Sequence, residues 1–399
     1  MVHHTMKISS SSAASASSRR SHIAGVVVKV AAAAILGTLA SCAVPPAPMP
    51  LPDAPPAAPA AGPVIERQGA RWVAVDWLAL PGWFDDTLAG AWPALQRSCE
   101  RPAPGWGALC AQALAATPVD DAAARHWLMQ RLQPYRVEAA DGSADGLITG
   151  YYEPLVEARR TPGGAFRVPL HAPPADLATR RPYWTRQQLD TLPAAQAALR
   201  GREIAYVADP LDALVLQIQG SGRLRVTEPD GRVQTVRLAF AGHNDQPYRS
   251  VGRWLIDQGQ LPAEQASWPA IKAWAQRHPQ RVNEMLWANP RVVFFREEPL
   301  PDPAVGPRGA QGVPLTPGRS IAVDPRSIPY GTPVWLDTTE PLASTPLRRL
   351  VVAQDTGSAI VGAVRADFFW GWDGDAEAQA GRMKQPLRMW VLWPRDAPR

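Results

Sequence analysis

The sequence predicts a mainly β protein that has a few short helices and a small closed β-barrel near its C-terminus. Two observations support this prediction. Residues 301–399 break into short apolar segments separated by Pro- and Gly-containing turns, which is typical of a small barrel rather than of alternating strands and helices. Two further strand-like segments lie on either side of Pro229-Asp230-Gly231, and a turn of this composition between such segments predicts a β-hairpin.

Residues 1–41 have the features of a signal peptide. Residues 30–38 form an uncharged apolar stretch, which is too short to span a bilayer but suits the hydrophobic part of a signal peptide. It is preceded by four basic residues, Lys7, Arg19, Arg20 and Lys29. The stretch ends in Leu39-Ala40-Ser41-Cys42, which resembles a bacterial lipobox and predicts lipidation of Cys42. The alternative is an ordinary signal peptide with an incidental cysteine.

Residues 42–66 are expected to be the lipidated cysteine followed by a linker. Between residues 44 and 63 nine prolines are interleaved mainly with alanine, and such a stretch is an extended spacer that cannot form a packed core. At about 3.1 Å per residue it could span roughly 60 Å.

The charge balance gives no reason to expect a nucleic-acid partner. Four of the 41 basic residues precede Cys42, which leaves 37 basic residues against 36 acidic ones, and a net charge near zero carries no electrostatic signal for nucleic acid. The seven histidines show no metal-ligand spacing, so no metal site is expected. Cys99 and Cys110 are expected to form a disulfide in an oxidising compartment, the alternative being two buried thiols.

Helices are expected mainly in residues 72–136, where Ala-rich patches occur. The alternation of Leu214 to Gln219 predicts a strand, which continues across the Pro229-Asp230-Gly231 turn into a second strand at residues 233–240. Two short helices are expected after it, one from Ser250 to a stop at Gly259 and one capped by Ser267. The C-terminal strands are expected at residues 320–323, 333–337, 349–354, 363–369 and 388–392.

The segment from Gln354 to Gly381 combines carboxylates with aromatic residues, as a saccharide-binding groove requires. Asp367 lies in a strand-like stretch before Phe368 and Phe369, where partial burial would raise its pKa and keep it protonated near neutrality. That is the property of a general acid. The alternative is that Asp355 and Asp367 accept backbone N–H groups in a structural role, which the residues alone favour for Asp355.

Two further segments have both a functional and a structural interpretation. Tyr151-Tyr152-Glu153 could line the same groove, or could be one buried and one exposed tyrosine on an ordinary strand. Gly220-Ser221-Gly222 could present a serine nucleophile, but the expected strand before it and the lack of a helix after it favour a bulge or tight turn.

Several segments together resemble the membrane-bound lytic murein transglycosylase A family. They follow one another in the family's order from about residue 149 to residue 392, and the resemblance is weaker from residue 77 onward. The segments are Thr149-Gly150-Tyr151-Tyr152-Glu153-Pro154, Gln219-Gly220-Ser221-Gly222, Ala241-Gly242-His243-Asn244-Asp245-Gln246-Pro247-Tyr248, Asn289-Pro290, Val293-Phe294-Phe295, Ala322-Val323-Asp324-Pro325, Asp355-Thr356-Gly357-Ser358-Ala359-Ile360, Asp367-Phe368-Phe369 and Trp390-Val391-Leu392. The chain departs from the family pattern at Asp245 and Ser358, where glycine is expected.

The resemblance implies a double-psi β-barrel made of residues 67–165 and 297–399, with a second β-rich domain, residues 166–296, inserted between its two parts. Asp367 matches the family's acid/base residue and Asp355 the neighbouring barrel aspartate. The expected substrate-binding residues are Tyr151, Tyr152, Glu153, Gln219, Gly220, Ser221, Gly222, Asp324, Gly357, Ala359 and Phe369.

The implied activity is cleavage of the β-1,4 bond between N-acetylmuramic acid and N-acetylglucosamine with formation of a 1,6-anhydro end, without a cofactor. The expected partners are peptidoglycan strands and, beside them, other cell-wall enzymes. The protein is expected on the periplasmic side of the outer membrane, held by its lipid. Two alternatives stay open: a glycan hydrolase that uses two carboxylates, and a non-catalytic lipoprotein that binds peptidoglycan.

Overall fold

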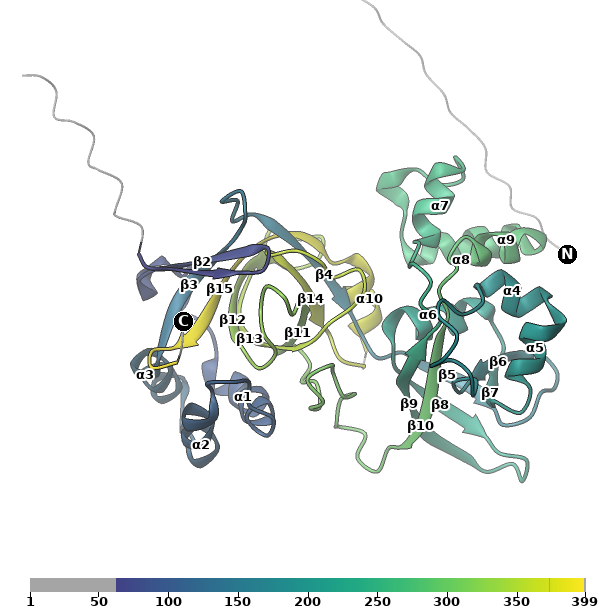
Figure 1. The fold of residues 1–399 in the computed structure, drawn as a ribbon, viewed down its shortest axis with the longest axis horizontal. Helices are drawn as coiled ribbons and strands as arrows, with labels where there is room; N and C mark the ends of the chain where they lie inside the picture. Colours follow the sequence, from purple (N-terminus) through teal and green to yellow (C-terminus); the bar gives the residue numbers. More distant parts are fainter. Residues whose placement is uncertain (1–61, 373, 398–399) are drawn as a thin grey trace, which may run out of the picture. The chain divides into compact units, whose positions relative to one another are not determined.

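The computed structural model describes residues 62–372 and 374–397 and contains two β-sheets with short helices around them (Figure 1). The signal peptide, the lipidated Cys42 and all but the end of the linker lie outside the described residues. Within those residues, the helices fall short of the length and hydrophobicity that a membrane span needs.

The first sheet has nine strands in the order β1-β2-β3-β15-β12-β13-β11-β14-β4. Because β15 pairs with β4 as well as with β3 and β12, the sheet curls back on itself into a nearly closed barrel. Its strands are β1 (Val64–Arg67), β2 (Ala70–Ala74), β3 (Leu132–Ala139), β4 (Gly146–Tyr151), β11 (Ser320–Val323), β12 (Pro333–Thr339), β13 (Pro346–Asp355), β14 (Arg365–Phe369) and β15 (Lys384–Pro394). All five predicted C-terminal strands are confirmed.

The second sheet has six strands in the order β10-β9-β8-β5-β7-β6. They are β5 (Leu155–Arg159), β6 (Val168–His171), β7 (Glu203–Val207), β8 (Gly222–Thr227), β9 (Val233–His243) and β10 (Val293–Pro299). The helices of this region are α4 (Arg186–Thr191), α5 (Pro193–Leu199), α6 (Pro210–Gln219), α7 (Val251–Asp257), α8 (Trp268–Arg277) and α9 (Val282–Trp287). Since β5 already belongs to this sheet, the chain leaves the barrel between Tyr151 and Leu155, earlier than the expected boundary at residue 165.

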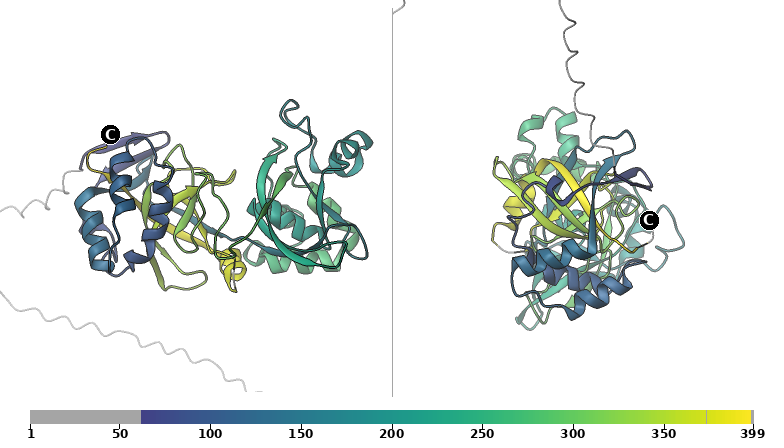
Figure 2. Two further views of the ribbon diagram at one scale, coloured as in Figure 1. Left: turned by 90° about the horizontal axis from the view of Figure 1, so that it is seen from below. Right: turned by 90° about the vertical axis from the view of Figure 1, so that its left-hand side faces the viewer.

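Three helices pack against the barrel: α1 (Trp92–Cys99), α2 (Gly107–Ala115) and α3 (Asp121–Arg131) (Figure 2). The Cys99–Cys110 disulfide joins α1 to α2, with an S–S distance of 2.12 Å, and confirms the predicted pairing. The buried side chain of Gln354 donates to Ser98 Oγ of α1 at 2.8 Å. This bond holds α1 against the end of β13, directly beside Asp355.

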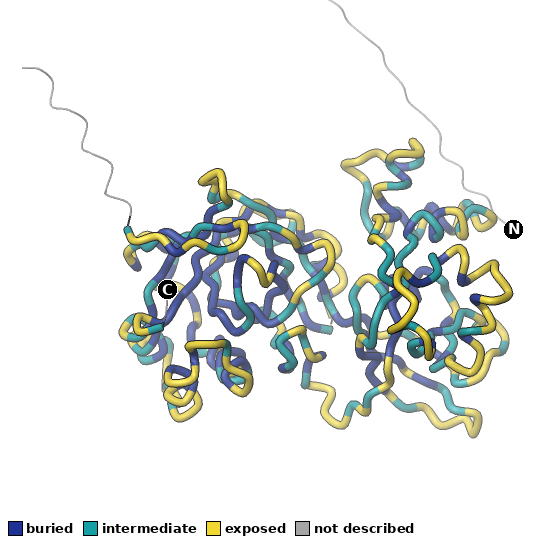
Figure 3. Tube along the Cα trace, in the orientation of Figure 1, coloured by how far each residue is buried: buried dark blue, intermediate teal, exposed yellow. Residues whose placement is uncertain are grey.

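Tryptophans fill much of the barrel core. Trp83 and Trp335 meet edge to face with ring centroids 5.1 Å apart, and Trp393 lies 5.3 Å from Trp72. Such pairs bury large apolar areas and add directional contact energy. Figure 3 shows the barrel strands mostly buried, with the exposed residues concentrated in loops and on the helices.

The predicted strand at Leu214 to Gln219 is wrong, because these residues belong to α6. Asp209 caps the helix, Pro210 occupies its first turn and Gly220 ends it in a left-handed conformation with φ of 77°. A short helix that is buried on most of its circumference lacks the 3.6-residue periodicity, and its apolar run therefore resembles a strand. The hairpin itself is confirmed, but its first strand is β8, which pairs with β9.

The two helices expected after the hairpin are confirmed as α7 and α8, capped by the hydroxyl groups of Ser250 and Ser267. Both caps accept a backbone N–H of the first turn, which would otherwise be unpaired.

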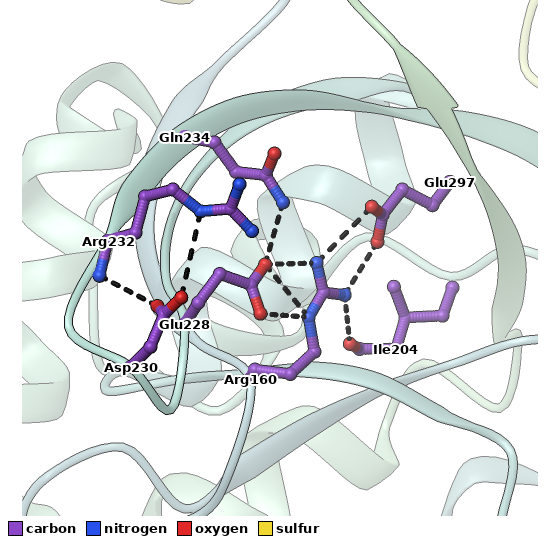
Figure 4. A network of polar contacts seen from close by, with 7 residues as sticks. All are labelled: Arg160, Ile204, Glu228, Asp230, Arg232, Gln234 and Glu297. Carbon is purple, nitrogen blue, oxygen red and sulfur yellow. Dashed lines mark hydrogen bonds and ion pairs between the residues drawn. The ribbon is translucent and has the colours of Figure 1, made fainter.

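A cluster of ion pairs holds the hairpin end of the second sheet (Figure 4). Arg160 Nη2 lies 2.8 Å from Glu228 Oε1, and Arg160 Nη1 lies 2.6 Å from Glu297 Oε2. The same Nη1 donates to the carbonyl of Ile204 at 2.8 Å. One guanidinium thus links the ends of β5 and β8 with β7 and β10, which fixes the strand register where the hairpin begins.

Candidate active site in the barrel

Asp367 and Asp355 lie in one row across the barrel sheet. Asp367 on β14 pairs with Ala322 on one side and with Thr149 on the other. Asp355, the last residue of β13, pairs with Ala322 from the opposite side. Laterally paired residues project from the same face of a sheet, and two strand spacings separate their Cα atoms by about 10 Å. The two carboxyl groups therefore face the same space, with only the small Ala322 between them.

Asp367 is partly buried and has one hydrogen-bond partner among the described residues. Thr149 Oγ1 donates to its Oδ1 at 2.6 Å, and Arg365 Nη2 donates in turn to Thr149 Oγ1 at 2.9 Å. Burial raises the pKa of Asp367 from 3.8 to about 6, against the opposing effects of Thr149 and Arg365. A carboxyl group with this pKa can both donate and accept a proton near neutrality.

Asp355 is held by three donors. Its Oδ1 accepts the backbone N–H groups of Ala310 and Thr356, both at 2.9 Å, and its Oδ2 accepts the hydroxyl of Tyr151 at 3.1 Å. Burial raises its pKa to about 6 although these three bonds act in the opposite direction. Donors that surround a carboxylate favour its ionised form. Asp355 is thus held more firmly in place than Asp367, and fewer of its lone pairs are free to exchange a proton with a substrate.

Tyr151 donates to Asp355 and lies on the same strand as Thr149, the partner of Asp367. It follows Thr149 by two residues on β4 and therefore points to the same face of the sheet. Burial first, and then the charges of Asp355 and Asp367, raise the pKa of Tyr151, so its phenol stays protonated and can donate. Phe369 is fully buried and packs against its ring at 5.2 Å between centroids, which fixes the hydroxyl position.

Asp324, the third expected aspartate, has a different environment. Arg326 Nη2 lies 2.7 Å from its Oδ2, and the N–H of Gly362 donates to the same oxygen at 3.0 Å. The side-chain bond from Arg326 lowers the pKa of Asp324 to about 2. A carboxylate that is ionised at all physiological pH values cannot act as an acid, so Asp324 fixes the loop around Gly362.

Glu153 has no exposed surface and forms two ion pairs. Its Oε2 lies 2.8 Å from Arg223 Nε and its Oε1 2.7 Å from Arg237 Nε. Arg223 also stacks over Trp372 at 4.2 Å from the ring centroid. Glu153 was expected to contact the substrate, but none of its atoms is accessible in this structure. The carboxylate instead joins the segment after β4 to strands β8 and β9.

The remaining expected binding residues gather near the start of the second sheet and in the loop after Asp355. The backbone N–H of Tyr152 donates to Gln219 Oε1 at 3.1 Å. At Gly222 an added Cβ would lie 2.1 Å from Leu216 Cδ2 and 3.2 Å from the carbonyl of Pro154, so glycine is needed for this close approach. The helix end at Gly220 supports the structural interpretation of this segment. Gly357 is partly exposed, and Ala359 is exposed.

Sequence reasoning missed the roles of Thr149, Arg365, Ala310 and Ala322. Thr149 and Ala322 lie in quoted family segments, but only strand pairing shows that they flank Asp367. The N–H of Ala310 leaves no mark in the sequence, because it reaches Asp355 from a loop 45 positions away. Within the part of the chain that the structure describes, no group of three or more His, Cys, Asp or Glu side chains could hold a metal ion.

Comparisons with known proteins agree with this arrangement. The family model described as the MltA specific insert domain matches residues 147–296, and the 3D domain model matches residues 319–393. The membrane-bound lytic murein transglycosylase A of Vibrio cholerae is 30% identical over 282 residues, 67% of this chain and 70% of that protein. The Escherichia coli K12 protein of the same name is 33% identical over 269 residues, 65% of this chain and 69% of that protein.

Solved structures give the same result. MltA from Neisseria gonorrhoeae has a TM-score of 0.71 and 32% identity, covering 85% of this chain and 96% of that chain. The lytic transglycosylase LtgG of Burkholderia pseudomallei has a TM-score of 0.57 and 48% identity, covering 84% of this chain and all (100%) of that chain. E. coli MltA with bound chitohexaose has a TM-score of 0.61 and 28% identity, covering 84% of this chain and 94% of that chain.

The barrel with its pair of carboxyl groups is that of an enzyme of the lytic transglycosylase class. Within this class, the chain belongs to the membrane-bound lytic murein transglycosylase A family. The match to the 3D domain model covers Asp324, Asp355 and Asp367.

Proposed function

We propose that this enzyme cleaves the β-1,4 bond between N-acetylmuramic acid and N-acetylglucosamine in peptidoglycan, leaving a 1,6-anhydro end, with Asp367 as acid and base. The observation that supports this assignment best is the environment of Asp367. Burial raises its pKa to about 6, and among the described residues only Thr149 binds its carboxyl group. The chitohexaose bound to the E. coli relative supports a β-1,4-linked aminosugar chain as substrate.

The chemistry uses one carboxyl group twice. Protonated Asp367 gives its proton to the glycosidic oxygen as the C1–O bond breaks through an oxocarbenium-like transition state. The substrate's N-acetyl group can stabilise C1 at this stage. The carboxylate then takes the proton of the muramyl C6 hydroxyl as its oxygen bonds to C1. Bonds and protons balance without water, and Asp367 returns to its protonated form.

The neighbouring residues would prepare Asp367 for both steps. Thr149 donates to Oδ1, which leaves Oδ2 to carry the transferred proton. Asp355 and Tyr151 would orient the sugar on the other side of Ala322. The phenol of Tyr151 donates its one proton to Asp355, so its oxygen would accept a hydrogen bond from a sugar hydroxyl while Asp355 holds it in place.

The location and the division of the chain form part of the same proposal. Lipidation at Cys42 and the proline-rich linker would hold the enzyme on the periplasmic side of the outer membrane, within reach of the murein layer. The relatives are named membrane-bound enzymes. The barrel would be built from residues on both sides of an inserted β-rich domain, with the glycan bound where the two parts meet.

A two-carboxylate hydrolase is the alternative that one observation favours, since Asp355 and Asp367 flank the same residue, Ala322. The experiment that separates the two is mass spectrometry of muropeptides that the protein lacking residues 1–41 releases from purified murein, compared with those released by Asp367→Asn. Products lighter by one water molecule, absent with the variant, are expected. Products with free reducing ends would establish the hydrolase. No release by the folded wild type would leave a binding lipoprotein.

A further inference from the structure

A cavity lies on the six-stranded sheet, built by residues outside the barrel. Its volume is about 440 Å³. One wall comes from the segment after β6 and the other from the end of β9. The apolar wall residues include Pro173, Pro174, Leu177 and Phe240. Phe240 is 47% exposed, which is uncommon for a phenylalanine on a strand and leaves a ring face available to a ligand.

The backbone around this cavity is irregular at three positions between residues 241 and 245. The pairing of β9 with β10 has a bulge at Ala241, between Phe240 and Gly242. At Gly242 an added Cβ would lie 3.1 Å from Leu177 Cδ2, so the glycine lets the two walls approach each other. Asp245 has a φ of 54°, a left-handed conformation that favours glycine. Bulges and left-handed residues of this kind concentrate at binding sites, where they direct side chains toward a ligand.

Asp245 uses this conformation to hold two side chains at the rim. Its Oδ2 lies 3.3 Å from Arg181 Nη1. Its backbone N–H donates to His243 Nδ1 at 3.0 Å, so the ring proton belongs on Nε2. Burial and the charge of Arg291 lower the pKa of His243. The imidazole is therefore neutral, and its Nε2–H is a donor.

The rim carries an exposed cationic side chain. Arg181 is 67% exposed in its side chain although Asp245 lies beside it, and the charge of Arg291 reaches His243 from outside the lining. An apolar wall of prolines, leucine and phenylalanine beside an exposed guanidinium and a neutral donor suits a short peptide that has small side chains and free carboxylates. A glycan chain offers hydroxyl and N-acetyl groups but no negative charge once its muramyl carboxyls are joined to peptide.

We propose that this cavity binds the stem peptide attached to N-acetylmuramic acid, with Arg181 pairing with a peptide carboxylate and Phe240 contacting its alanine methyl groups. The inference rests on the proposed function, because it makes peptide-bearing murein strands the preferred substrate. Specificity then resides in the second sheet, separate from Asp367, which performs the chemistry.

The direct test is calorimetric titration of the protein with the free tripeptide L-Ala-γ-D-Glu-meso-diaminopimelate, which contains no glycosidic bond. Arg181→Ala and Phe240→Ala are each expected to weaken binding about tenfold, the loss of one exposed contact worth about 1.4 kcal/mol. Arg225→Ala is the matched control, since Arg225 is an exposed arginine of β8 paired with Glu157 at 2.8 Å. Equal affinities for all four proteins, or competition by chitohexaose, would overturn the proposal.

Weaker peptide binding by Arg181→Ala could also follow from a local change of structure, and a variant that gains affinity excludes this explanation. Asparagine tolerates the left-handed conformation, so Asp245→Asn keeps the backbone and removes the charge that competes for Arg181. Peptide affinity is expected to rise about threefold at low salt, and the gain should shrink as salt is added. A decrease would contradict the assigned role of Arg181.

The same variants can be compared on murein strands with and without their peptides. Wild type is expected to have the higher kcat/KM on substituted strands, and the ratio should fall towards one in Arg181→Ala. Cleavage with an unchanged ratio would overturn the peptide site but leave the proposed function intact. Absence of cleavage by the wild type would contradict the proposed function, while peptide binding could still be measured.

Discussion

Glu153 lies where the chain leaves the barrel, and Asp367 lies on β14 within the barrel. Glu153 is fully buried and Asp367 is partly buried. Glu153 is paired with Arg223 and Arg237 at 2.8 and 2.7 Å. Asp367 has a threonine hydroxyl at 2.6 Å, and burial raises its pKa to about 6. Burial alone therefore does not make a catalytic acid. The difference lies in whether positive charge compensates the buried carboxylate, and this difference separates a structural group from a reactive one.

Replacing Asp367 tests the reactive side of this comparison and should have the largest effect on rate. Asp367→Asn is expected to lower kcat on murein by about 10²- to 10⁴-fold, the usual contribution of a general acid–base group. Its unfolding free energy at pH 7 should not fall, because the variant removes a buried charge that has no arginine paired with it directly. Denaturant titration at pH 7 checks this expectation. A variant that loses activity only because it unfolds would contradict it.

Replacing Glu153 should have the opposite result. Glu153→Gln leaves the guanidinium groups of Arg223 and Arg237 buried without a counter-charge, and the expected loss of stability is about 3–5 kcal/mol. Glu157→Gln is the matched control, because Glu157 is 55% exposed and pairs with Arg225. The control should change stability by less than about 1 kcal/mol. Similar losses of unfolding free energy in both variants would show that the buried ion pairs of Glu153 contribute no more to stability than the exposed pair of Glu157.

The pH dependence of stability compares the two kinds of carboxyl group within one protein. Asp355 and Asp367 have native pKa values of about 6, above the ordinary 3.8. Between these values the native state binds more protons than the unfolded state, so the unfolding free energy decreases as pH rises from about 4 to about 6. The loss approaches about 3 kcal/mol for each carboxyl group.

Asp324 contributes in the opposite direction over a lower range. Its pKa of about 2 gives stability that is present above pH 4 and lost as pH falls towards 2. The double variant Asp355→Asn, Asp367→Asn should therefore flatten the decrease between pH 4 and 6 and leave the acid limb in place. An unchanged slope in the double variant would show that other groups produce it.

How far the sequence predicted the molecule depends on whether a feature is local. The C-terminal strands and the capped helices α7 and α8 were predicted because short apolar runs, turns and caps lie within a few residues of one another. The segment at Leu214 failed because its alternation of apolar residues with Gln217 and Gln219 fits a strand, although the residues belong to a largely buried helix. The paired state of Glu153 could not be read from the sequence, since its arginines lie 70 and 84 positions away.

The candidate site divides in the same way. The resemblance pointed to Asp367 and Asp355, and residue type suggested a raised pKa for Asp367. Neither indicated that Ala322 separates the two carboxyl groups, or that Thr149 reaches Asp367 from 218 positions away. Those contacts come from strand order, which places β4, β14, β11 and β13 side by side.

Removing the hydroxyl of Thr149 is expected to have the smallest effect, and it tests how Thr149 sets the pKa of Asp367. Thr149 Oγ1 donates to the carboxyl group and stabilises its ionised form. Thr149→Val keeps the side-chain shape, so the pKa of Asp367 should rise. Because the proposed mechanism needs Asp367 protonated, the alkaline limb of the kcat/KM profile should move upward by as much as about one pH unit.

The matched control for this shift is Thr338→Val. The hydroxyl of Thr338 on β12 donates to the carbonyl of Pro386 at 2.7 Å, within the same barrel but not to a carboxyl group. The control should lose some stability without moving the alkaline limb. If both variants shifted the limb equally, the shift would reflect a general loosening of the barrel. If Thr149→Val alone moved it downward, the group that titrates on that limb would not be Asp367.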